Sequence, residues 1–139
     1  MKGKPRILIV DDEPQSADIM AHLFTDIFPS LSKTRDFLAT IAIGGEMALR
    51  LMRDSGPFDF VLTDGNMEDM DGIDFMLAVR AGKTEGINGT SRWVPIGLLT
   101  AWGQEEYIHR DFKISDFEFI LRKPVDSRKV FEYVCRAIT

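Results

Sequence analysis

Residues 7–14 read ILIVDDEP, in which four branched apolar residues run directly into three carboxylates and a proline. The apolar run is typical of a buried strand, whereas carboxylates resist burial because they lose their hydration and repel one another. This pattern, a buried strand that ends in a cluster of carboxylates, predicts that a cation lies at the carboxyl end of the strand and compensates the negative charge.

Further short apolar runs continue this pattern along the chain. They span residues 37–43, 58–63, 94–100 and 117–121. Because these runs lack strict alternation of apolar and polar residues, they favour strands that are covered on both faces, as in parallel sheets.

Amphipathic helical patterns lie between and after these strands. They span residues 19–28, 47–52, 73–81, 104–112 and 130–138. Pro29 is expected to end the first of them, and residues 29–35 and 81–92 are expected to form surface loops. Five strands that alternate with five helices predict an α/β fold with an open, doubly wound sheet.

The composition limits the classes of function. With 139 residues, 45% of them hydrophobic, the chain fits one compact domain. Its net charge of −5 argues against nonspecific binding to nucleic acid, which needs a clustered basic surface. The single cysteine, Cys135, excludes an intramolecular disulfide and favours a reducing compartment. The sequence contains no signal peptide and no membrane span, so we expect a cytoplasmic location.

Ligands of doubly wound sheets bind beyond the carboxyl ends of the strands, and the residues expected there share one chemistry. Carboxylates that converge at one edge favour Mg²⁺, a carboxylate can attack phosphorus, and a hydroxyl and an ammonium group can bind phosphoryl oxygens. The residues at these strand ends are Asp11, Asp12, Asp64, Thr100 and Lys123. The sequence therefore predicts a pocket for phosphoryl transfer.

Four motifs, ILIVDDEP, VLTDGNMEDMDG, PIGLLTA and LRKPV, together resemble the receiver domain of two-component response regulators. The resemblance extends from Ile7 to Ile138. It implies a single receiver domain over residues 1–139, with a flavodoxin-like, five-stranded parallel sheet of strand order 2-1-3-4-5 and five helices.

The resemblance also implies a role for each residue at the strand ends. Asp64 is expected to be the phosphoacceptor, Thr100 the switch hydroxyl and Lys123 the phosphate-binding lysine. The Lys123–Pro124 bond is often cis in such domains. The expected ligands of Mg²⁺ are Asp12, Asp64, the backbone carbonyl of Asn66 and, largely through water, Asp11.

The expected partner is a histidine kinase or a histidine phosphotransfer protein, which donates the phosphoryl group. The domain would catalyse its own phosphorylation and dephosphorylation with Mg²⁺, but it would act primarily as a signalling switch. It would control an output partner or domain that the sequence does not name. The chain is either a free-standing regulator or the N-terminal piece of a longer protein. No contact with nucleic acid or membrane is expected, and the oligomeric state stays open.

Several positions depart from the family pattern. Ile120 stands where an aromatic ring usually couples phosphorylation to the outer face, and Glu68 stands where proline is common. Asp116 and Phe117 replace the usual Gly-Ala before the last strand, so we do not carry over the dimer of related domains. Trp102 lies two residues after Thr100, where an indole would shade an acyl phosphate from water and prolong its lifetime.

Other titratable residues are interpreted structurally. Asp69 and Asp71 are expected to form a turn and to begin a helix rather than to bind metal. His22 and His109 are expected on the surface, and Cys135 in the core.

Three alternatives remain beside the phosphorelay switch. The first is a pseudo-receiver, a protein-binding module that works without phosphorylation. The second is a phosphohydrolase with an aspartyl-phosphate intermediate, which would need an acid at position 66, where this chain has Asn66. The third is a flavin-binding domain, which would need a phosphate-cradling loop instead of the acidic DDEP.

Overall fold

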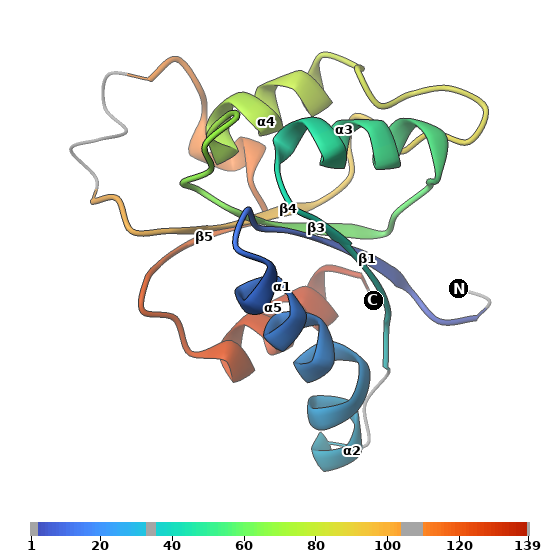
Figure 1. The fold of residues 1–139 in the computed structure, drawn as a ribbon, viewed down its shortest axis with the longest axis vertical. Helices are drawn as coiled ribbons and strands as arrows, with labels where there is room; N and C mark the ends of the chain where they lie inside the picture. Colours follow the sequence, from blue (N-terminus) through green and yellow to red (C-terminus); the bar gives the residue numbers. More distant parts are fainter. Residues whose placement is uncertain (1–2, 33–35, 104–109, 139) are drawn as a thin grey trace.

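The computed structural model describes residues 3–32, 36–103 and 110–138, and its strands form one parallel sheet in the order β2-β1-β3-β4-β5 (Figure 1). The strands are β1 (Arg6–Val10), β2 (Leu38–Ala42), β3 (Phe60–Asp64), β4 (Ile96–Thr100) and β5 (Phe119–Arg122). This arrangement confirms the predicted doubly wound sheet, its strand order and the flavodoxin-like fold.

Helices cover both faces of the sheet: α3 and α4 lie on one face, and α1 and α5 lie on the other (Figure 1). Their bounds are α1 (Pro14–His22), α2 (Phe28–Ser32), α3 (Gly45–Asp54), α4 (Gly72–Arg80) and α5 (Ser127–Ala137). The helix predicted at residues 104–112 falls mostly outside the described residues. Its described end, residues 110–112, is not helical, and a short 3₁₀ turn, η3 (Ile114–Asp116), follows.

The prediction that Pro29 ends the first helix was wrong. A π-helical segment, η1 (Leu23–Ile27), follows α1 directly, and α2 continues the rod as far as Ser32. Pro29 is the second residue of α2, and the π-helical hydrogen-bond register of η1 just before it accommodates a residue that has no backbone N–H. Residues 29–32 are therefore helical rather than part of a loop.

Alternate residues of the central strands enter two separate cores. Leu8 and Val10 of β1 pack beneath α3 and α4, whereas Ile7 and Ile9 face α1 and α5. This burial on both faces explains why the apolar runs lack alternation. Four phenylalanines fill the second core in mutual ring contact, and they are Phe24, Phe28, Phe37 and Phe131.

Two predictions about single side chains can be checked in the described residues. His22 is exposed and pairs with Asp26 at 3.1 Å, which confirms its surface position, while His109 lies outside the described residues. Cys135 is half-buried at the edge of the second core. Among the described helices, none is both long enough and apolar enough to span a membrane.

Candidate functional site

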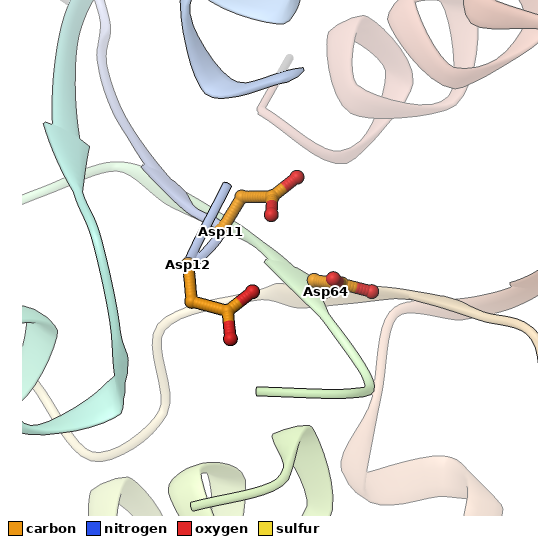
Figure 2. Close-up of side chains that lie close together, drawn as sticks. All are labelled: Asp11, Asp12 and Asp64. Carbon is orange, nitrogen blue, oxygen red and sulfur yellow. The ribbon is translucent and has the colours of Figure 1, made fainter. Parts of the chain in front are cut away.

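Three carboxylates meet at the carboxyl end of the sheet, because β1 and β3 are neighbouring parallel strands that end side by side. Asp11 and Asp12 follow β1, and Asp64 is the last residue of β3. One carboxylate oxygen from each of Asp11, Asp12 and Asp64 lies within 4.8 Å of the others. Figure 2 shows these side chains grouped at the two strand ends.

The environment of this cluster fits a hard divalent cation. Asp64 is only 9% exposed, so its carboxylate has little contact with water. Burial raises the pKa of Asp11, and repulsion from Asp64 and Asp12 raises it further. A hydrogen bond from the Glu13 amide lowers the pKa but does not outweigh these effects. A group of oxygen donors whose charges oppose one another is the kind of site that Mg²⁺ stabilises. Asp11, Asp12 and Asp64 are therefore suited to hold that ion.

Lys123 contributes the positive charge at this edge. It follows β5 directly, and its Nζ donates a hydrogen bond to Oδ1 of Asp64 over 2.8 Å. The Lys123–Pro124 peptide bond is cis, as the sequence resemblance implied. The Lys123 side chain is 40% exposed, so it is accessible to solvent.

Thr100 ends β4 between the strands that carry Asp64 and Lys123. Its side chain is buried, and its Oγ1 accepts a hydrogen bond from the backbone N–H of Trp102 over 3.0 Å. Gly65 packs directly against it: a Cβ added to Gly65 would lie 2.8 Å from both Cβ and Oγ1 of Thr100. The sequence analysis missed this role of Gly65, for which the adjacent strand-end Asp64 was the only available signal.

Hydrogen bonds hold the loop between β3 and α4 to both α4 and α3. Asp71 caps α4 by accepting a hydrogen bond from the Asp74 amide over 2.8 Å, which confirms that it begins a helix. Asp69 instead accepts hydrogen bonds from the amides of Gly45 and Glu46 in α3, over 3.1 and 2.8 Å. Burial alone would raise the pKa of Asp69, but these amide bonds outweigh it and lower the pKa.

Arg110 forms an ion-pair cluster that sequence reasoning missed. Its guanidinium donates to Oδ2 of Asp71 over 2.8 Å and to Oδ1 of Asp74 over 2.7 Å. The pKa of Asp71 is raised by burial but lowered more strongly by the bonds from Arg110 and the Asp74 amide, so it lies below its usual range. The cluster joins the start of α4 to the chain that leads from β4 to β5.

The remaining predicted positions lie around this pocket. Asn66 is exposed, and its backbone N–H donates a hydrogen bond to Oδ1 of Asp64 over 3.4 Å. Trp102 is half-buried against the core beneath α3 and α4, where Ile120 also packs. Phe119 faces the opposite core and stacks on Phe60, with ring centroids 5.8 Å apart. Because adjacent strand residues point to opposite faces, Phe119 cannot substitute for an aromatic ring at position 120.

Comparison with known proteins gives one family. The family model described as "Response regulator receiver domain" matches residues 7–135. Among curated proteins, the chain is 34% identical over 104 residues to the chemotaxis protein CheY of Pseudomonas aeruginosa, a match that covers 74% of this chain and 72% of that protein.

Solved structures show the same fold. A sensor protein from Polaromonas sp. JS666 superposes with a TM-score of 0.75 at 22% identity, covering 98% of this chain and 97% of that one. The response regulator TrrA from Thermotoga maritima, whose structure is a complex with Mg²⁺ and BeF, gives a TM-score of 0.66 at 24% identity, with 96% and 98% coverage.

Proposed function

The chain belongs to the response regulator receiver domain family, and we propose that it is a phosphorelay switch that accepts a phosphoryl group on Asp64. The donor is a phosphohistidine of a histidine kinase or a histidine phosphotransfer protein. The single observation that carries this proposal is the position of the Asp64 carboxylate, which lies within 4.8 Å of Asp11 and Asp12 and 2.8 Å from Lys123 Nζ.

The proposed transfer uses the Asp64 carboxylate as the nucleophile. An Asp64 oxygen bonds to phosphorus while the P–N bond of the donor breaks, and the leaving imidazole takes up a proton. Hydrolysis later breaks the new O–P bond, releases inorganic phosphate and restores the carboxylate. Bound Mg²⁺, held by Asp11, Asp12, Asp64 and the Asn66 carbonyl, would neutralise charge on the phosphoryl oxygens.

Lys123 and Thr100 would respond to the new group. The phosphoryl group adds close to two negative charges at pH 7, and it replaces the carboxylate as the preferred partner of the Lys123 ammonium. The Thr100 hydroxyl, now an acceptor for the Trp102 amide, would turn to donate to a phosphoryl oxygen. Since Trp102 packs against the core beneath α3 and α4, this change would reach the surface without an aromatic ring at position 120.

In this function, residues 1–139 act as a single receiver domain in the cytoplasm. Magnesium binding and phosphorylation are general features of this family, which support both steps. Control of an output partner or domain completes the proposed switch.

Mass spectrometry tests the proposal directly. Incubation with acetyl phosphate and Mg²⁺ is expected to add the mass of one phosphoryl group, and a chelator is expected to prevent the gain, because the acidic cluster repels an anionic donor when no cation is bound. Absence of any mass gain would contradict the phosphorelay switch and favour a pseudo-receiver.

Trp102→Ala is expected to shorten the lifetime of the phosphoryl group severalfold. The indole lies two residues beyond Thr100, and its removal would open a path for water toward the phosphorus atom. The measurement is the decay of the phosphorylated protein after the donor is removed. Trp93→Ala is the control, because Trp93 is 76% exposed and precedes β4 at the end of the strand opposite to Thr100. Equal lifetimes for wild type and Trp102→Ala would contradict shielding.

A further inference from the structure

The loop between β3 and α4 contacts two parts of the molecule through three consecutive residues. The backbone N–H of Glu68 donates to Oδ2 of Asp12 over 3.0 Å. The carboxylate of Asp69 binds the first amides of α3, and the side chain of Met70 lies against Gly45. One short segment thus contacts both Asp12 of the acidic cluster and the start of α3.

Asp69 replaces a capping residue that α3 itself does not have. The residue before α3 is Gly44, which has no side chain to accept a hydrogen bond from the first turn. The free N–H groups of that turn need an acceptor, and Asp69 supplies both of its oxygens from 24 residues away in the chain.

The fit between the loop and α3 is close. A Cβ added to Gly45 would lie 2.6 Å from Sδ of Met70, and one added to Gly44 would lie 3.1 Å from the Asp69 oxygens. Consecutive glycines therefore let the loop approach the helix backbone. At its base, the loop is closed by a 2.9 Å hydrogen bond from the Gly72 amide to the Gly65 carbonyl.

We propose that Asp69 is a positioning residue for the metal site: by anchoring the loop on α3, it holds the Glu68 amide against Asp12 and so orients a magnesium ligand. This inference rests on the proposed function, since it assumes that Asp12 binds Mg²⁺. Groups that orient a ligand typically change metal affinity by about 10- to 100-fold when they are removed. The same linkage makes the start of α3 sensitive to occupancy of the site, because coupling between two events is reciprocal.

Isothermal titration of the whole chain with MgCl₂ tests the inference. Asp69→Ala is expected to weaken Mg²⁺ binding by about 10-fold or more, whereas Asp69→Asn, which keeps one acceptor oxygen, is expected to lose less. Glu46→Gln is the matched control: it removes an exposed negative charge at the same helix start but keeps the amide that Asp69 binds. It is expected to leave the affinity nearly unchanged.

Hydrogen exchange provides a second readout that does not depend on phosphorylation. In the wild type, Mg²⁺ is expected to slow exchange of the Gly45 and Glu46 amides, and this effect is expected to disappear in Asp69→Ala. A purely structural cap would lower the melting temperature of folded Asp69→Ala without changing its Mg²⁺ affinity, and that result would overturn the inference. If the wild type itself bound no Mg²⁺, the proposed function would fail as well.

Discussion

Asp64→Asn is expected to abolish incorporation of the phosphoryl group while the protein stays folded. The amide side chain has no ionised oxygen to attack phosphorus. Lys123 donates a hydrogen bond to Oδ1 of Asp64 in the described structure, so the ammonium that would bind the phosphoryl oxygens already lies beside this carboxylate.

The effect on folding is expected to be small. Asp64→Asn breaks the ion pair with Lys123, but the lysine side chain is 40% exposed, so its ammonium is hydrated when the pair is lost. It also removes one of three mutually repelling charges. The melting temperature without Mg²⁺ should therefore stay close to that of the wild type.

The measurement is mass spectrometry after incubation with acetyl phosphate and Mg²⁺. Asp54→Asn is a suitable control because this exposed acid lies at the far end of α3 and pairs only locally with Arg53 in the described structure. It should incorporate one phosphoryl group as the wild type does. If Asp64→Asn gained the same mass, another residue would be the acceptor.

Gly65→Ala is expected to slow phosphorylation by about 100-fold, since a misplacement of about 1 Å in a reacting group is enough for such a loss. The added Cβ would lie 2.8 Å from Cβ and Oγ1 of Thr100, closer than carbon atoms approach one another. The strand end that carries Asp64 must therefore move away from Thr100, and overpacking of this kind costs about 1–3 kcal/mol of stability.

The rate of mass gain with a fixed concentration of acetyl phosphate measures this effect. Gly86→Ala is the control, because a Cβ at Gly86 meets no atom within 4 Å. Any loss of stability there would come from the local backbone, at φ +150°, and would leave the pocket intact. A wild-type rate in Gly65→Ala would show that Asp64 does not depend on the close packing between Gly65 and Thr100.

Much of the fold could be predicted because its main determinants are local. Each central strand must be apolar on both faces to lie between two layers of helices, and this requirement is visible in runs such as Ile7–Val10. Likewise, parallel strands place their carboxyl ends at one edge, so the convergence of Asp11, Asp12 and Asp64 could be predicted before any distance was known.

The sequence did not predict two features: the continuation of the first helix past Pro29 and the bonds of Asp69 to α3. Pro29 is a helix breaker by itself, but it is accommodated where η1 shifts the helical register. Asp69 does serve its own loop, where it accepts a hydrogen bond from the Met70 amide over 2.9 Å, but its additional bond to the Glu46 amide of α3 could not be predicted. Nothing in the neighbouring sequence distinguishes these outcomes, because they depend on how packed elements meet.

The sequence by itself determined the order of the strands along the chain, the two-faced burial of the sheet and the chemical character of its carboxyl edge. These features follow from hydrophobic burial and from charge, which each residue carries with it. Only the tertiary structure decided the partners of the loop residues: Asp69 with α3 from 24 residues away, and Asp71 with Arg110 from 39 residues away. Such pairs form because packing brings distant backbone and side chains within hydrogen-bonding distance, and that proximity is a property of the whole fold.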